Sequence, residues 1–156
     1  MSAITSAKSK LGFVGIGYMG RPIAQRLLKS GFRLTAYDRH RTKAEELIPY
    51  GGTVAENVAE LSSSCDVVLS CLASDEAVLN IYKGADGAFA NSHRGSLVID
   101  LSTVSPQTAR AEPSLGIERV ARRTVGAALR RGGVIANMID QIKALLEESV
   151  QETSKP

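Results

Sequence analysis

Short apolar runs alternate with amphipathic segments along most of this chain. Strands of a parallel sheet covered on both faces are nearly continuously apolar, whereas helices repeat apolar residues every three or four positions. Alternation of the two predicts an α/β fold with a doubly wound parallel sheet. The predicted strands are 11–14, 32–37, 53–55, 66–72 and 96–101, and the predicted helices are 21–30, 41–50 and those that start after Asn57, after Ser74 or Asp75, and after Ser105.

A glycine-rich turn follows the first predicted strand. Gly15, Gly17 and Gly20 have the spacing G-x-G-x-x-G and lead directly into a helix. The first glycine permits a tight turn, the second lets the backbone approach a diphosphate, and the third lets the helix pack closely on the sheet. Such turns also occur as purely structural corners. Here the complete strand–turn–helix–strand unit favours nucleotide binding.

An acidic residue completes this unit. Asp38 follows the second predicted strand, about 20 residues beyond the glycines, where a carboxylate can bind the 2′-hydroxyl of a ribose. The free N–H groups at the start of the helix offer a site for the diphosphate. The sequence therefore predicts a dinucleotide-binding Rossmann-type domain. Its ligand site would lie at the carboxyl ends of the strands.

The chain divides into four segments. Residues 1–10 are predicted to form a flexible tail, 11–112 the Rossmann domain, 113–150 a helical C-terminal extension and 151–156 a frayed tail. One amphipathic pattern in the extension runs from Ile117 to Leu129 and another from Ile135 to Leu146. Their apolar stripes could form a homo-oligomer or cover the edge of the sheet.

Composition and charge narrow the class of protein. With 156 residues, a net charge of +3 and 44% hydrophobic residues, the chain is typical of one globular domain. The basic residues are scattered, so we expect no nucleic-acid partner. No apolar run approaches the roughly 20 residues that span a membrane, and residues 1–10 lack the apolar core of a secretory signal.

The two cysteines indicate a reducing compartment. If Cys65 and Cys71 bracket one extended strand, they lie roughly 20 Å apart, beyond disulfide reach. No cluster of metal ligands accompanies them, so we expect no metal site. Buried free thiols favour a cytoplasmic location or an organelle matrix.

Three segments in order, Gly12–Gly20, Asp66–Val68 and Asp100–Pro106, resemble the β-hydroxyacid dehydrogenases. That family includes 3-hydroxyisobutyrate dehydrogenase, tartronate semialdehyde reductase and relatives of 6-phosphogluconate dehydrogenase. The resemblance covers about 11–112, which is the family's N-terminal cofactor domain only. It implies an NAD(P)-binding domain of an oxidoreductase that transfers hydride between nicotinamide and a small 3-hydroxyacid or its semialdehyde.

The resemblance also implies a set of cofactor-binding residues. The diphosphate would be held by the three glycines and the backbone N–H groups between them, the adenine ribose by the acid, and the nicotinamide half by the turns after two later strands. The residues are Gly15, Gly17, Tyr18, Met19, Gly20, Asp38, Arg39, Leu72, Ala73, Ser102 and Thr103. Ala73 stands where many relatives have proline.

The residues after the second strand bear on the choice of cofactor. Asp38 would accept a hydrogen bond from the 2′-hydroxyl of NAD and repel the 2′-phosphate of NADP. Arg39, His40 and Arg41 follow directly and could instead bind that phosphate. We favour NAD over NADP on the strength of the carboxylate.

The family resemblance ends after Glu112. Relatives continue with a strand, a substrate-binding Ser-Gly-Gly motif and a second domain whose lysine acts as general acid and base. Lys143 lacks the surroundings of that lysine and is more simply a solvated residue, so no catalytic residue is assigned. Two hypotheses remain: a dehydrogenase cofactor domain that needs a substrate domain for activity, or a non-catalytic nucleotide-binding or assembly module.

Overall fold

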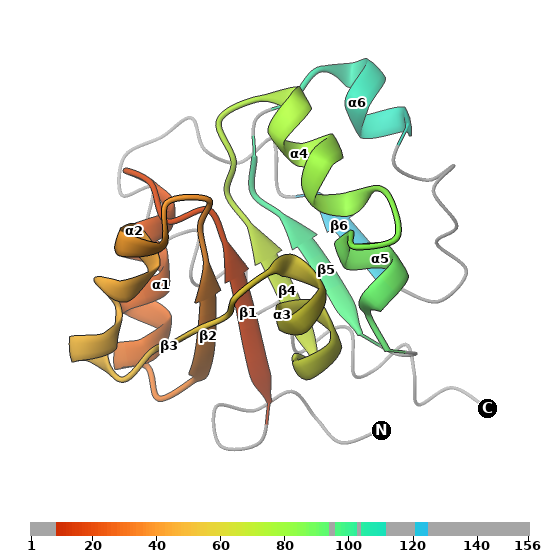
Figure 1. Cartoon of the computed structure of the whole chain (residues 1–156). Helices are drawn as coiled ribbons and strands as arrows, with labels where there is room; N and C mark the ends of the chain where they lie inside the picture. The colour runs from red at the N-terminus through yellow and green to blue at the C-terminus, as the bar shows by residue number, and fades with distance from the viewer. Residues whose placement is uncertain (1–8, 94–95, 103, 112–120, 125–156) are drawn as a thin grey trace.

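A computed structural model describes residues 9–93, 96–102, 104–111 and 121–124 (Figure 1). Strands and helices alternate along most of this part of the chain. The elements are β1 (Lys10–Val14), α1 (Gly20–Lys29), β2 (Arg33–Tyr37), α2 (Arg41–Glu45), the 3-10 helix η1 (Ile48–Tyr50), β3 (Thr53–Val54), α3 (Val58–Ser64), β4 (Val67–Ser70), α4 (Asp75–Tyr82), α5 (Ala88–Asn91), β5 (Leu97–Asp100), α6 (Pro106–Ala111) and β6 (Ala121–Thr124).

The described strands form one parallel sheet in the order β3-β2-β1-β4-β5-β6. The chain starts in the middle with β1, moves outward to β3 and then returns to β4 on the other side of β1. This reversal is the switch point at which doubly wound sheets bind ligands, outside the carboxyl ends of the strands. The predicted fold class is therefore confirmed.

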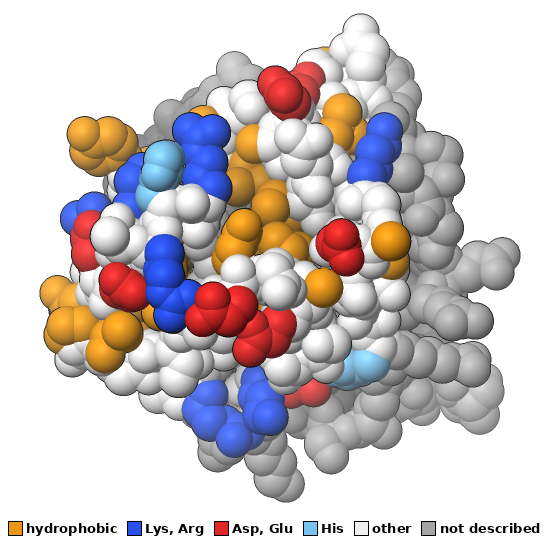
Figure 2. All heavy atoms as spheres, viewed as in Figure 1, with side chains coloured by type: hydrophobic (Ala, Val, Ile, Leu, Met, Phe, Trp, Pro, Cys, Tyr) orange, Lys and Arg blue, Asp and Glu red, His pale blue; other side chains and the backbone are white. Residues whose placement is uncertain are grey.

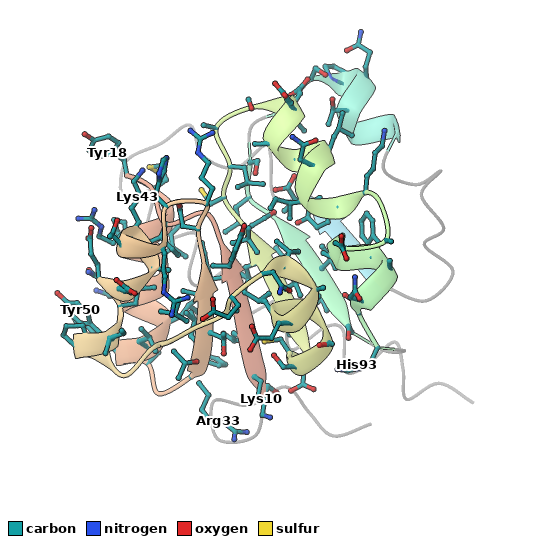
Figure 3. The ribbon with its side chains drawn as sticks, in the orientation of Figure 1. Lys10, Tyr18, Arg33, Lys43, Tyr50 and His93 are labelled. Carbon is teal, nitrogen blue, oxygen red and sulfur yellow. The ribbon has the colours of Figure 1, made fainter. Side chains whose placement is uncertain are left out.

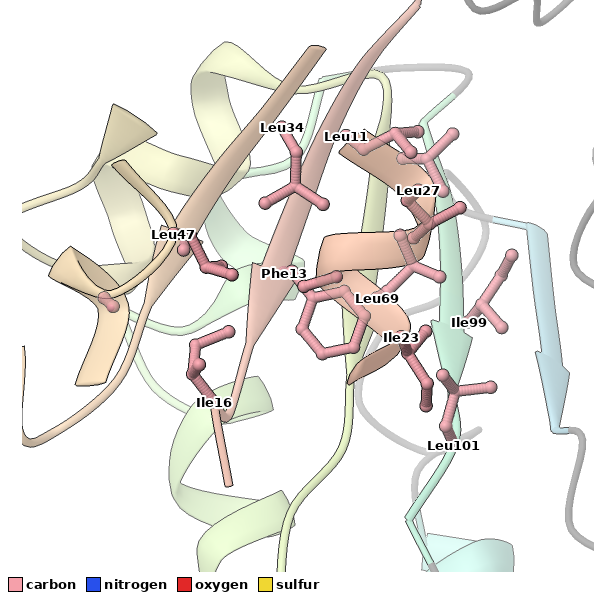
Figure 4. Close-up of a cluster of buried hydrophobic side chains, with 14 of the residues drawn as sticks. Leu11, Phe13, Ile16, Ile23, Leu27, Leu34, Leu47, Leu69, Ile99 and Leu101 are labelled. Atoms are coloured by element: carbon pink, nitrogen blue, oxygen red, sulfur yellow. The ribbon is translucent and has the colours of Figure 1, made fainter. Parts of the chain in front are cut away.

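One hydrophobic cluster fills the space between the sheet and the α1–α2 layer. Alternate residues of a strand point to opposite faces, and Leu11 and Phe13 of β1 share this face with Leu69 of β4. Ile23 and Leu27, one turn apart on α1, pack against them (Figure 4). This packing fixes the start of α1 against the end of β1.

The opposite face of the sheet carries a second cluster. It contains Val14 of β1, Val68 of β4 and Val98 of β5. These side chains pack against side chains of α3, α4 and α5. Helices thus cover both faces, as Figure 1 shows, which explains why the central strands β4 and β5 are largely apolar. Val67–Ser70 and Leu97–Asp100 are buried at every position.

Local capping explains where the helices begin. Asn57 accepts the Glu60 N–H at 2.8 Å, as predicted, and Ser74 rather than Asp75 caps α4.

The predicted helix 41–50 is instead divided into α2 and η1, since Pro49 has no N–H to continue a helical ladder. The short helix α5 was not predicted. No helix in the described ranges is long and apolar enough to cross a membrane.

The prediction of a helix over Ile117–Leu129 is wrong at Ala121–Thr124, which form strand β6. β6 pairs in parallel with β5, and Ala121 lies opposite Leu97. The backbone N–H and C=O groups of β5 form hydrogen bonds with this segment, and local periodicity in the sequence cannot predict such a pairing. The pairing therefore determines the structure here, against the helical pattern. The remainder of the predicted extension 113–150, its proposed role in oligomer formation and the predicted tail 151–156 lie outside the described residues. Of the predicted tail 1–10, only Ser9 and Lys10 are described, and Lys10 already belongs to β1 while Ser9 is buried.

We predict that Phe13→Ala lowers the free energy of unfolding by about 3–5 kcal/mol, because the fully buried ring fills the space between β1 and α1. Urea denaturation measures this change. Ile48→Ala is the control, since its side chain is 55% exposed and its removal should change stability by no more than about 0.5 kcal/mol. Equal effects of the two substitutions would contradict this account of the core.

Candidate functional site: the carboxyl edge of the sheet

The glycine turn connects β1 to α1 through two close backbone contacts. Gly15 has φ +92°, and a Cβ at this position would lie 2.3 Å from the carbonyl oxygen of Cys71. A Cβ on Gly20 would lie 1.9 Å from the carbonyl oxygen of Gly15. Both positions therefore require glycine, one for its backbone conformation and one for close packing of the helix on the turn.

The middle of the turn is open. A Cβ on Gly17 would have no heavy atom within 4 Å, so this stretch of backbone faces free space. Within the described residues, the N–H groups of Gly17, Tyr18 and Met19 have no hydrogen-bond partner. The N-terminus of α1 has neither a side-chain cap nor an acidic residue in its first turn. Such an end attracts an anion through its N–H groups and the helix dipole.

Asp38 lies at the end of β2, directly beside this turn. Its Oδ2 accepts the Ile16 N–H at 2.8 Å, and its Oδ1 accepts the His40 N–H at 2.8 Å. The carboxylate is half-buried, and each oxygen keeps a lone pair for a further donor. The structure thus brings the predicted acid and the predicted glycine turn into one site.

Basic side chains surround the turn after β2. Arg39 and His40 are exposed, and Tyr18 and Lys43 lie at the same edge of the molecule (Figure 3). Figure 2 shows a group of Lys, Arg and His side chains at the upper left of the view, beside hydrophobic side chains in its middle. This edge therefore combines positive charge with apolar surface.

Arg41 is already paired. Its guanidinium donates to Glu56 at 2.7 Å and to Glu45 at 2.9 Å. The hydrogen bonds that Arg41 donates to Glu56 and Glu45 raise the pKa of Arg41 above its ordinary value. Its charge therefore faces these carboxylates, although the sequence placed it with Arg39 and His40 as a candidate for phosphate binding.

The turns after β4 and β5 are joined to each other. Leu72 donates its N–H to Ser102 Oγ at 2.8 Å, and Ser105 donates its N–H to Asp75 Oδ1 at 2.9 Å. The hydrogen bonds from Ser105 lower the pKa of Asp75. Leu72 is half-buried, and Ala73 is exposed. The structure brings Leu72, Ala73 and Ser102 to one edge, whereas Thr103 lies outside the described residues.

A buried polar group beneath these turns escaped the sequence analysis. Ser70 Oγ donates to Asp100 Oδ1 at 2.7 Å and also pairs with the hydroxyl of Tyr82. Asp100 and Ser70 are both fully buried. The available signal was a carboxylate at the end of an otherwise apolar strand, followed two residues later by serine.

The cysteines bracket β4 as the sequence predicts, and both are free thiols. Burial raises the pKa of the Cys71 thiol to about 11, so the thiol is protonated at neutral pH. Burial also raises the pKa of Cys65. No group of metal-ligating side chains occurs among the residues that the structure describes.

The two histidines lie at opposite edges of the sheet. His40 follows Asp38 at the carboxyl edge, whereas His93 lies near Lys10 and Arg33 at the amino edge (Figure 3). His93 Nε2 is 3.6 Å from a carboxylate oxygen of Asp66. His93 is thus far removed from the glycine turn, and Lys143 lies outside the described residues.

These residues fit a dinucleotide. The open backbone at Gly17, the uncapped end of α1 and the adjacent carboxylate provide an anion site next to a hydroxyl acceptor. All lie at the carboxyl ends of parallel strands, at the switch point of the sheet. Fold and site together define a dinucleotide-binding Rossmann domain.

Comparison with known proteins identifies the family. A family model for the NAD-binding domain of 6-phosphogluconate dehydrogenase matches residues 10–142, and the chain belongs to this family. The mitochondrial 3-hydroxyisobutyrate dehydrogenase of Mus musculus is 34% identical over 105 residues, 67% of this chain and 31% of that protein. The NAD-dependent L-serine dehydrogenase of Pseudomonas aeruginosa is 30% identical over 148 residues, 90% of this chain and 49% of that protein.

Solved structures agree with this assignment. The 3-hydroxyisobutyrate dehydrogenase of Mycobacterium tuberculosis with L-serine has a TM-score of 0.70 at 25% identity, covering 85% of this chain and 43% of that one. Psf3 in complex with NADP+ and 2-OPP has a TM-score of 0.72 at 30% identity, covering 88% and 53%. The predicted resemblance to the cofactor domain of the β-hydroxyacid dehydrogenases is confirmed. The chain spans about a third to a half of the length of the curated relatives described above.

We predict that Gly20→Ala destabilises the fold by about 1–3 kcal/mol, because its Cβ would collide with the Gly15 carbonyl oxygen and the backbone must shift. Gly17→Ala is the matched control. Its Cβ meets nothing, so stability should change by less than about 0.5 kcal/mol. Thermal unfolding followed by circular dichroism measures the stability of both variants. A Gly20→Ala variant as stable as the wild type would contradict the described packing.

Proposed function

We propose that this chain is the cofactor-binding part of an oxidoreductase that transfers hydride between a nicotinamide dinucleotide and a small 3-hydroxyacid or its semialdehyde. The observation that carries this proposal is the open glycine turn, where the N–H groups of Gly17, Tyr18 and Met19 have no partner among the described residues and lie beside the carboxylate of Asp38. The N–H groups would bind the diphosphate. Asp38 would accept a hydroxyl of the adenosine ribose.

The nicotinamide would supply the hydride when the dinucleotide is bound. That end of the molecule would be held by Leu72, Ala73 and Ser102, which lie on the joined turns after β4 and β5. By resemblance, Thr103 would lie beside them. The proton for the substrate oxygen would come from the lysine of the family's second domain.

The names of the relatives support the substrate class. One is a 3-hydroxyisobutyrate dehydrogenase and another an L-serine dehydrogenase. Both substrates carry a hydroxyl on the third carbon of a short carboxylic acid. Because both relatives are dehydrogenases, we favour a dehydrogenase domain over a non-catalytic nucleotide-binding or assembly module.

The geometry after β2 favours NAD over NADP. Asp38 presents a carboxylate where the 2′ position of the ribose would lie, and a carboxylate repels phosphate. Arg41, which could counter this repulsion, is engaged by Glu45 and Glu56. Arg39 has no ion pair within the described residues, so it is the arginine left to meet a 2′-phosphate. One arginine beside a carboxylate is a weaker phosphate site than a pair of arginines.

The free thiols support a proposal about location. Cys65 is buried and Cys71 is partly buried, and neither forms a disulfide. We propose a reducing compartment, either the cytoplasm or an organelle matrix.

We predict that the chain binds NADH in calorimetry and that Gly17→Val weakens this binding at least about tenfold, because the added side chain would occupy the space of the diphosphate. The exposed substitution Ala90→Val on α5 should leave the affinity unchanged. Both variants should unfold at nearly the wild-type temperature. A folded wild-type chain that binds no nicotinamide nucleotide would overturn the proposed function.

We also predict that NADH binds more tightly than NADPH. Glu56→Gln should reduce this difference in affinity, because it removes one of the two carboxylates that bind Arg41 and leaves part of its guanidinium for a 2′-phosphate. Fluorescence titration with both reduced cofactors measures the ratio of dissociation constants, which should fall by about threefold to tenfold in the variant. Glu76→Gln, an exposed change on α4, is the control. Tighter binding of NADPH by the wild type would contradict the preference for NAD.

A further inference from the structure

Asp100 is a fully buried carboxylate at the end of β5. Its Oδ1 accepts two hydrogen bonds, from Ser70 Oγ at 2.7 Å and from the Ser102 N–H at 3.0 Å. Its Oδ2 is buried and has no hydrogen-bond partner among the described residues. A buried oxygen without a donor is unfavourable, so an apolar residue would suit the stability of the sheet better than this carboxylate.

The hydrogen bonds of Asp100 shape the turn that follows β5. By accepting the N–H of the residue two positions on, Oδ1 bends the chain at Ser102. This places Ser102 Oγ where it accepts the Leu72 N–H at 2.8 Å. One carboxylate oxygen thus holds the turn after β5 directly and the turn after β4 through Ser102.

Ser70 secures the carboxylate from the neighbouring strand. Ser70 lies opposite Asp100 in the register of β4 and β5, and its hydroxyl also pairs with Tyr82 of α4. The Tyr82 ring stacks on Phe89, with ring centroids 4.8 Å apart. The hydroxyl that donates to the carboxylate is therefore itself held by a side chain of α4 that is fixed by packing.

Asp100 and Ser70 lie beneath the place that the nicotinamide half of the proposed cofactor would occupy. The glycine turn and Asp38, at the ends of β1 and β2, would take the diphosphate and the adenosine. The nicotinamide end would then lie across the switch point, over the ends of β4 and β5, the next strands of the sheet (Figure 1). These are the two strands that Asp100 and Ser70 connect.

We propose that Asp100 is a positioning residue for the nicotinamide end of the dinucleotide. Its Oδ1 fixes Ser102, and Ser102 fixes Leu72, so that both turns already have their binding shape when the cofactor arrives. Because the turns are ordered before the cofactor binds, less conformational entropy is lost on binding. This inference rests on the proposed function, because it assumes that a nicotinamide dinucleotide occupies the edge of the sheet.

The test compares a whole cofactor with a fragment that lacks nicotinamide. Calorimetry measures the affinities of the full chain and of Asp100→Ala for NADH and for ADP-ribose. We expect Asp100→Ala to weaken NADH binding by about tenfold and to change ADP-ribose binding by less than about twofold. Asp100→Asn keeps an amide oxygen that can accept the Ser102 N–H, so it should restore most of the affinity for NADH.

Ser96→Ala is the matched control. Ser96 directly precedes β5 and is buried, and its hydroxyl has no partner within the described part of the chain. Its loss should alter neither affinity. If Asp100→Ala does not fold, Ser70→Ala decides the question, because it removes one of the two donors that hold Oδ1 and leaves the other, the Ser102 N–H, in place. A loss confined to NADH supports the proposal.

Equal losses for NADH and ADP-ribose, or no loss for either, would overturn the positioning role and leave the proposed function intact. A folded wild-type chain that binds neither molecule would instead refute the proposed function. The two failures are therefore distinguishable in the same set of titrations.

Discussion

The contact between the start of α1 and the end of β1 is the constraint on which the site depends. The Gly15 carbonyl oxygen approaches Gly20 so closely that no side chain fits between them. Phe13, Ile23 and Leu27 hold the helix in this position from below. The uncapped N–H groups of α1 are therefore presented at the edge of the sheet, where they can bind an anion.

Polar interactions continue this arrangement around the edge. Asp38 accepts the Ile16 N–H and so joins the glycine turn to the end of β2. Across the switch point, Ser102 and Leu72 join the turns after β5 and β4. Hydrophobic packing holds the body of the domain together, while these few hydrogen bonds between chain segments fix the loops that face the ligand.

The pattern of the sequence predicted β1, β4 and β5 most clearly because these central strands are covered on both faces and are largely apolar. It predicted the glycine turn and Asp38 because each depends on local chemistry: a left-handed backbone, a close approach and an acid at the end of a strand. It failed at Ala121–Thr124, where β5 provides the partner, and it predicted one helix over 41–50 where the structure has α2 and η1.

The sequence by itself thus determined the order of the elements, the glycine turn and the acid beside it. Only the tertiary structure decided that Arg41 is bound to Glu56, 15 residues away, and that Asp100 is held by Ser70, 30 residues away. The physical reason is range. Backbone conformation and periodicity are properties of neighbouring residues, whereas the partner of a charged or polar side chain depends on which distant strands and loops the sheet brings together.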